Sequence, residues 1–344
     1  MDFRVWQLVL VATVFGLSGC TRSENRVVVY CAQDREFAED LFASFQSETN
    51  LAVSPKFDTE ANKSVALAAE LEREQDRPRA DLHWNNEILA TIRLARKGVY
   101  EAYRSPEAEP YPDWSRSSDF LWQAFASRAR VLIVNTNLVP ESERPKSMLE
   151  LTAVKWNNRV AMAKPQFGTT ATQAACLFEV MGSDAAKAYY LGLRNNGVQI
   201  VSGNKQVAMG VAEGRFAVGF TDTDDAMIEL NAGKPVTIVF PDADGHPDFP
   251  RFGTLYIPNT LAVVRGGPNP EGAKRLMDYL LQPKTEARLA LAGGFQIPLN
   301  PRVTVALPPA LRTPTQVKPM RVDFERAADL WDRTQTFLRE EFAR

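Results

Sequence analysis

The sequence is poor in the residues from which many catalytic and structural sites are built. Its 344 residues include only two histidines, His83 and His246, so a metal centre made of several histidines is excluded. Three cysteines are too few for a disulfide-stabilised scaffold. Neither sign of charge dominates, because 40 Lys and Arg residues stand against 42 Asp and Glu residues. The sequence lacks the basic excess of a typical nucleic-acid-binding protein and therefore argues against that class.

The composition and length that remain are those of a globular protein. Hydrophobic residues make up 45% of the chain and charged residues 24%, which excludes disordered and fibrous architectures. A chain of 344 residues is long enough for one large or two medium domains.

The N-terminal residues indicate export. Val5–Leu17 is an almost continuous apolar run, too short for a membrane-spanning helix of about 20 residues but typical of a signal-peptide core. The LSGC sequence that ends at Cys20 resembles the lipobox of bacterial lipoproteins. That resemblance implies a signal peptide at 1–19, a lipidated Cys20 and a tether at 20–25, which place the protein on the periplasmic face of a membrane or on the cell surface. The alternative is an ordinary cleaved signal followed by a coincidental cysteine.

Strand-like and helix-like segments alternate along most of the chain. Arg26–Cys31 is a continuous apolar run, typical of a parallel strand that is buried on both faces, and a helical pattern follows at 37–45. Prolines at 105–114 interrupt the alternation, and a second series begins with the strand predicted at Arg130–Asn135. The pattern predicts an α/β fold of two lobes with right-handed crossovers.

The last part of the chain has a different pattern. A strand is predicted at Thr260–Arg265, and a proline-rich stretch follows at 298–319. The remainder predicts one amphipathic helix whose apolar stripe consists of Phe324, Ala327, Ala328, Trp331, Leu338 and Phe342.

Five segments carry a resemblance to a known family. They are VVVYCAQD at 27–34, ADLHWNNE at 80–87, RVAMAKPQFGTT at 159–170, NNGVQIVSGNKQVAMGVAEGRFAVGFTDTDDA at 195–226 and NTLAVVRGGPNPEGAKRLMDYLL at 259–281. In this order they resemble the periplasmic solute-binding proteins of ABC importers, in the branch that includes ferric-iron binders.

The resemblance implies a type II-like periplasmic-binding-protein clamshell with hinge strands between its lobes. Lobe one would comprise 26–128 and 255–305, lobe two 129–254, and a C-terminal segment 306–344. A ligand would lie in the cleft and be delivered to the ABC permease and ATPase subunits. The implied protein is a monomer without enzymatic activity or a resident cofactor, attached to the membrane through its lipid.

The acidic run Asp222–Asp225 stands at a predicted strand-to-helix junction. One interpretation is a helix cap with acidic residues that complement the helix dipole. The other is a cluster of hard oxygen ligands for a cation. By the resemblance, Asp224 and Asp225 occupy the positions of the paired tyrosines of ferric-iron binders, and Asp34 replaces a histidine that is often found in the first cleft loop. With Glu87 of the second cleft loop, these residues form the predicted metal site for Fe(III) or another hard cation.

Further ligand contacts are expected around the same cleft. The second cleft loop offers Trp84 and Asn86, although the alternative is a hinge-filling ring and a helix cap. Gly168, Thr169 and Thr170 precede a helix whose N-terminal N–H groups suit an anion. In iron-binding relatives this turn holds a synergistic anion, whereas an ordinary capped helix is the alternative. Asp222 completes the predicted ligand contacts.

Two ligand classes therefore remain open. Fe(III) or another hard cation is the first. A small organic solute such as a carboxylate or phosphonate is the second, because the tyrosine pair of ferric binders is missing. A metal-dependent hydrolase is disfavoured, since the sequence contains no Gly-x-Ser-x-Gly elbow.

Overall fold

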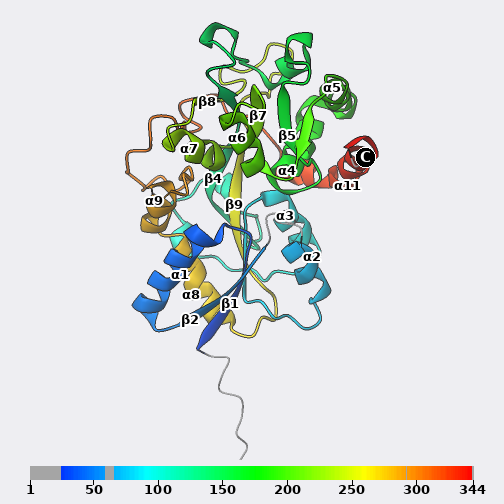
Figure 1. Cartoon of the computed structure of the whole chain (residues 1–344). Coiled ribbons are helices and arrows are strands. Elements are labelled where there is room, and N and C mark those ends of the chain that lie inside the picture. Colours follow the sequence, from blue (N-terminus) through cyan, green and yellow to red (C-terminus); the bar gives the residue numbers. More distant parts are fainter. Residues whose placement is uncertain (1–24, 59–65, 292, 343–344) are drawn as a thin grey trace, which may run out of the picture.

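The chain folds into two α/β lobes joined by crossing strands, as the sequence predicts (Figure 1). This computed structural model describes residues 25–58, 66–291 and 293–342. Its strands are β1 Arg26–Cys31, β2 Ala52–Phe57, β3 Leu82–Asn85, β4 Gln123–Asn135, β5 Val160–Ala163, β6 Gln199–Val201, β7 Val218–Asp222, β8 Val236–Val239 and β9 Tyr256–Val263. Its helices are α1 Arg35–Thr49, α2 Ala66–Arg73, α3 Ile88–Arg96, α4 Gly168–Met181, α5 Ser183–Asn195, α6 Asn204–Ala212, α7 Thr223–Asn231, α8 Pro270–Leu280, α9 Pro283–Leu291, α10 Phe324–Asp329 and α11 Trp331–Phe342.

Lobe one is built on the parallel strands β2, β1 and β3, with β9 antiparallel beside β3. The apolar run of β1 is almost wholly buried, because helices cover the sheet: α8 packs on β1 and β9, and α1 packs on β2. These elements form the lower lobe in Figure 1.

Lobe two is built on β5, which lies parallel to both β6 and β7. β4 runs antiparallel to β7 on one edge and to β8 on the other. Helices α6 and α7 pack on these strands, and α4 packs against α5. The carboxyl ends of β5, β6 and β7 lead directly into α4, α6 and α7, which brings three helix N-termini to one edge of the sheet.

Strands β4 and β9 connect the two lobes. β4 pairs with β9 up to Ala129 and with β7 from Arg130 onward, so a single strand belongs to both lobes. The sequence predicted only Arg130–Asn135 and Thr260–Arg265, which was wrong at both N-terminal boundaries. Polar residues in the first half of β4 interrupt the apolar pattern, but they are buried and hydrogen-bonded. The predicted lobe boundaries near 128 and 255 fall in β4 and just before β9, and they stay predictions.

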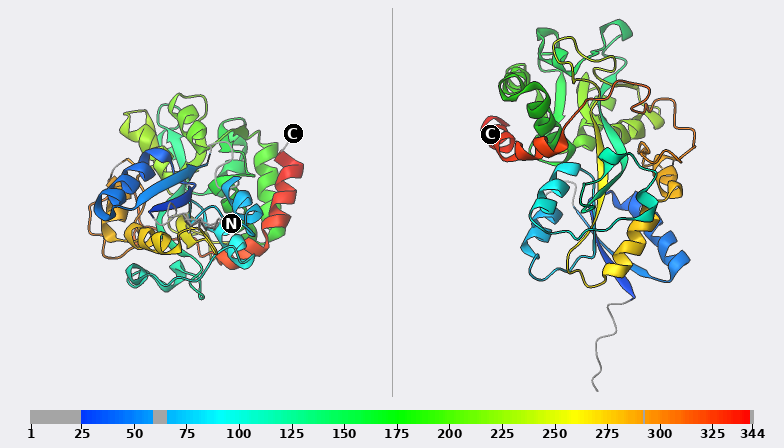
Figure 2. Two further views of the ribbon diagram at one scale, coloured as in Figure 1. Left: turned by 90° about the horizontal axis from the view of Figure 1, so that it is seen from below. Right: turned by 180° about the vertical axis from the view of Figure 1, so that it is seen from behind.

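The C-terminal segment forms two helices instead of the single amphipathic helix that the sequence predicted, because the helix is interrupted at Leu330. Phe337 of α11 packs on Phe178 of α4, with ring centroids 5.7 Å apart. Figure 2 shows the C-terminal helices beside α4 and α5. Arg96 of α3 forms ion pairs with Glu325 and Asp329 of α10, so this segment also contacts lobe one. None of the described helices has the length and apolar character needed to cross a membrane.

Candidate functional site

A small cavity of about 40 Å³ lies where the two lobes meet. Asp34 and Asn86 line it from lobe one, Arg128 lines it from β4, and the ends of β5, β6 and β7 supply its other walls. Eight of the ten predicted metal- and ligand-binding residues line this cavity: Asp34, Asn86, Gly168, Thr169, Thr170, Asp222, Asp224 and Asp225.

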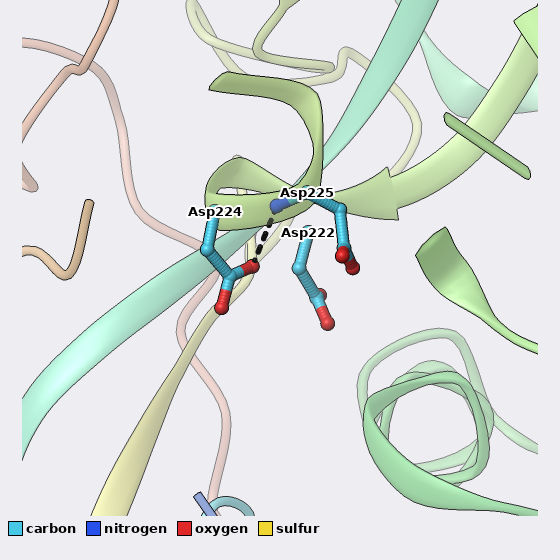
Figure 3. Close-up of side chains that lie close together, drawn as sticks. All are labelled: Asp222, Asp224 and Asp225. Carbon is cyan, nitrogen blue, oxygen red and sulfur yellow. Dashed lines mark hydrogen bonds between the residues drawn. The ribbon is translucent and has the colours of Figure 1, made fainter. Parts of the chain in front are cut away.

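The acidic residues at the end of β7 line this cavity, and Figure 3 shows that their side chains lie close together. A carboxylate oxygen from each of Asp222, Asp224 and Asp225 lies within 4.8 Å of the other two. The backbone turn from β7 into α7 causes this convergence, because Asp222 precedes the helix and the other two occupy its first turn. Asp224 Oδ1 also accepts a hydrogen bond of 3.1 Å from the backbone N–H of Asp225.

Asp222 is fully engaged by protein donors. Arg130, which is 1% exposed, donates from Nη1 to Asp222 Oδ1 at 2.8 Å. Oδ2 accepts hydrogen bonds from the Thr169 hydroxyl at 2.5 Å and from Asn204 Nδ2 at 2.9 Å. The negative charge of Asp222 is therefore balanced by an arginine of lobe two, and both of its carboxylate oxygens accept hydrogen bonds from lobe two.

Asp224 is paired with Arg128, the side chain that follows the bulge in β4. Arg128 Nε lies 3.1 Å from Asp224 Oδ2, and Gln296 Nε2 donates to the same oxygen at 3.1 Å. The guanidinium also donates to Gln33 Oε1 at 3.0 Å and to the Asn86 carbonyl at 3.2 Å. Arg128 thus joins both lobes.

The electrostatics of the cleft centre on the same arginine. Burial lowers the pKa of Arg128, but the surrounding carboxylates raise it above its usual value. In order of effect these carboxylates are Asp224, Asp222, Asp34 and Asp225. Arg128 is therefore a permanent cation among the four acidic side chains.

Three helix N-termini border the cavity. They belong to α4, α6 and α7, whose N-cap residues are Phe167, Gly203 and Asp222. Within the described part of the chain, none of these residues forms a side-chain capping hydrogen bond. Lys164 lines the same cavity. Because N–H groups in the first turn lack intrahelical acceptors, the arrangement suits an anion.

Glu87 is not brought to the acidic cluster. It caps α3, where its carboxylate accepts hydrogen bonds from the N–H groups of Leu89 and Ala90 at 2.8 and 2.9 Å. The Thr172 hydroxyl of α4 donates to it across the lobes at 2.8 Å. Burial raises the pKa of Glu87, and these hydrogen bonds offset only part of that rise. The side chain lines a different, larger cavity.

Trp84 is also absent from the walls of the small cavity among the described residues. Its ring is fully buried in lobe one, where it packs against Phe42 and Phe125 at centroid distances of 5.9 and 5.2 Å. The ring therefore belongs to the hydrophobic core.

Sequence reasoning missed the basic residues of the cleft. Arg128 and Arg130 are two positions apart in the buried strand β4, a spacing that directs both side chains to one face of the strand. Two arginines at positions i and i+2 of a buried strand require acidic partners, so this pattern was the available signal. Lys164 and Asn204 carried no comparable signal.

Comparison with known proteins gives a consistent result. The family model described as "Bacterial extracellular solute-binding protein" matches residues 90–326. The major ferric iron-binding protein of Neisseria meningitidis is 24% identical over 83% of this chain and 85% of its own length. A putative 2-aminoethylphosphonate-binding periplasmic protein of Salmonella typhi is 23% identical over 83% of each chain.

Solved structures share the fold. Iron-bound HitA from Pseudomonas aeruginosa superposes with a TM-score of 0.81 at 18% identity, over 92% of this chain and 99% of that one. The periplasmic binding protein AfuA from Actinobacillus pleuropneumoniae, with bound fructose-6-phosphate, superposes with a TM-score of 0.79 at 23% identity. The match covers 92% of this chain and 98% of AfuA. These likenesses confirm the two-lobed architecture that the sequence predicted.

Proposed function

The chain belongs to the family of bacterial extracellular solute-binding proteins, and on that premise we propose that it is the substrate-binding component of an ABC importer. It captures a solute between its lobes and delivers it to the permease and ATPase subunits as a monomeric transport protein without catalytic activity. The cavity between the lobes, whose walls come from both of them, supports this proposal.

The ligand that we propose is a small organic anion with a phosphate, phosphonate or carboxylate group. The observation that carries it is the convergence of three helix N-termini without side-chain caps, among the described residues, on a cavity that Lys164 also lines. Anions are stabilised at such N-termini by N–H groups and by the helix dipole. The carboxylates of Asp34 and Asp225 on the same walls would meet hydroxyl or amino groups of the solute.

Fe(III) is the second candidate, because three carboxylates lie within 4.8 Å of one another and a relative is named for ferric iron. The two buried arginines of the cleft argue against Fe(III) as the ligand. Arg130 and Arg128 already neutralise Asp222 and Asp224, and a guanidinium beside a trivalent cation is repulsive. A synergistic anion at Gly168–Thr170 would be required to offset that repulsion.

Thermal unfolding and calorimetry distinguish the two candidates. The purified protein is titrated with methylphosphonate, 2-aminoethylphosphonate, fructose 6-phosphate and ferric citrate, since a ligand that binds only the folded state raises its apparent stability. We expect an organic anion to bind, and Lys164→Ala to weaken it about tenfold, or about 1.4 kcal/mol. Lys234→Ala, which removes an exposed lysine of the same lobe, is the control. Binding of ferric iron alone, lost in Asp225→Asn, would contradict the proposal.

We further propose that residues 1–19 are a signal peptide and that Cys20 carries the lipid that attaches the protein to the membrane. Both lie outside the described residues. The support is the apolar Val5–Leu17 run followed by LSGC at 17–20, together with the family, whose members are extracellular. A membrane anchor would keep the binding protein close to its permease.

A further inference from the structure

A second and larger cavity, of about 860 Å³, adjoins the small one between the lobes. Its walls come from α2 and α3 of lobe one, from the β5–α4 connection of lobe two and from the C-terminal helix α11. Lys164, Phe167 and Gly168 line both cavities, so the two are contiguous at the N-terminus of α4. A volume of this size is typical of a site for a small organic molecule.

Hydrogen-bond donors on the walls of this cavity are only partly paired with protein acceptors: Arg339 Nη2 donates to the Thr336 hydroxyl at 3.1 Å. Gln335 of α11 is only 5% exposed, yet its Nε2 has no hydrogen-bond partner within the described structure. A buried amide without a partner is costly and marks a place where a ligand or water accepts. Across the described ranges, neither Lys164 nor Arg339 forms an ion pair with a carboxylate, although both line the cavity.

The acidic side chains of the same cavity are already engaged. Glu72 pairs with Lys97 at 2.5 Å, Asp332 lies 3.7 Å from Arg93, and the third, Glu87, caps α3. The unpaired charge that faces the cavity is therefore positive, from Lys164 at its junction with the small cavity and from Arg339 on α11.

We infer that the larger cavity is a second compartment of the ligand site, which binds a second anionic group of an elongated organic solute through Arg339 and Gln335. The inference rests on the proposed function, because the first anionic group occupies the small cavity. Phe167, Trp331 and Phe342 line the compartment and provide apolar surface for the carbon skeleton between the two anions. The ligand class is thus an organic bisphosphate or a phosphonate that carries a distant acidic group.

In this proposal the C-terminal helix α11 forms one wall of the ligand site. α11 packs on lobe two through Phe337, and its first turn contacts Arg93 of α3 in lobe one through Trp331 and Asp332. A solute that contacts both walls binds better when the lobes are together than when they are apart. It therefore shifts the equilibrium toward the closed arrangement.

Isothermal titration calorimetry with fructose 6-phosphate and fructose 1,6-bisphosphate tests the inference, because the two probes differ by one anionic group. We expect the wild-type protein to bind the bisphosphate about tenfold or more tightly than the monophosphate. Arg339→Ala and Gln335→Leu should each reduce this ratio about fivefold or more. Arg333→Ala removes an exposed arginine from the same helix outside the cavity and should leave the ratio unchanged.

The outcomes separate the two proposals. The second compartment is refuted if the wild-type protein binds both probes equally, or if the ratio of bisphosphate to monophosphate affinity is the same in all three variants. Either result leaves the proposed anion site in the small cavity intact. If neither probe nor iron-free citrate binds and ferric citrate does, the proposed organic-anion ligand fails, and the inference fails with it. Because Gln335 is buried, the urea midpoint of Gln335→Leu is measured in parallel as a test of folding. If this variant does not fold, the affinity ratio of Arg339→Ala, which changes an exposed residue, tests the inference.

Discussion

Arg128 Nε lies 3.1 Å from Asp224 Oδ2 across the cleft, and the two side chains are 3% and 7% exposed. The arginine comes from the strand that joins the lobes, and the aspartate comes from the first turn of α7 in lobe two. Because Arg128 also donates to Gln33 and to the Asn86 carbonyl of lobe one, one guanidinium links the acidic cluster to both lobes. The charge that balances the acidic residues is thus built into the fold.

Removing Arg128 should destabilise the protein strongly. Arg128→Gln leaves Asp224 buried without its cation, which typically costs about 3–5 kcal/mol of unfolding free energy. Urea denaturation measures the loss. The double variant Arg128→Gln/Asp224→Asn should recover part of it, because no unpaired carboxylate then remains at that position. A loss below about 1 kcal/mol in the single variant would contradict the pairing, since that is the range of exposed ion pairs.

The same substitution should create a cation site. Once Arg128 is gone, Asp224 loses its arginine partner whereas Asp222 keeps Arg130, so the converging carboxylates of Asp224 and Asp225 should attract a hard cation. Terbium luminescence should therefore rise in Arg128→Gln relative to the wild-type protein. It should fall again in Arg128→Gln/Asp225→Asn, which keeps the cavity but removes one oxygen ligand. Equal terbium binding in wild type and Arg128→Gln would show that the arginine does not compete with a metal.

Glu87 should make stability depend on pH. Burial raises its pKa in the folded state, so the folded protein binds a proton more readily than the unfolded chain. Its contribution to stability is therefore complete below the unfolded-state pKa of about 4.3 and is lost as the pH rises through the folded-state pKa.

The comparison of Glu87→Gln with wild type isolates this contribution. Relative to wild type, the variant should gain unfolding free energy as the pH rises, by about 1.4 kcal/mol for each unit by which the folded-state pKa exceeds the unfolded one. Thr172→Val, which removes a hydrogen bond that favours the ionised carboxylate, should steepen the pH dependence instead. Urea midpoints between pH 4 and 8 measure both effects, and parallel curves for wild type and Glu87→Gln would refute the assignment.

Membrane attachment should depend on Cys20. In Cys20→Ala the thiol that would receive the lipid is missing, so the protein should either leave the membrane fraction or accumulate as an unprocessed precursor. Fractionation and intact-mass measurement check this in the expressing cells. Cys176→Ala, which changes a buried cysteine of α4, is the control and should fractionate like wild type. A processed, membrane-bound Cys20→Ala protein would exclude lipid attachment at this residue.

Much of the architecture was accessible from the sequence. The apolar run of β1 and the alternation of strand and helix patterns indicated the α/β lobes, because each pattern reports on burial within its own element. The resemblance to periplasmic solute-binding proteins implied most of the residues that line the small cavity, including Asp34 and Thr170. β4 was underestimated, because a hinge strand that buries hydrogen-bonded polar residues does not show a continuous apolar pattern.

Only the tertiary structure decided how the cleft is charged. Asn86 and Glu87 are neighbours in one loop, yet the first lines the small cavity whereas the second turns to cap α3 and contact Thr172. Arg130 and Asp222 lie 92 residues apart and meet because β4 and β7 are paired. Sequence patterns show the residue types and their periodicity, whereas charge compensation depends on which side chains meet in space. The acidic run that suggested a metal site in the sequence thus contains two carboxylates, those of Asp222 and Asp224, that pair with Arg130 and Arg128 in the fold.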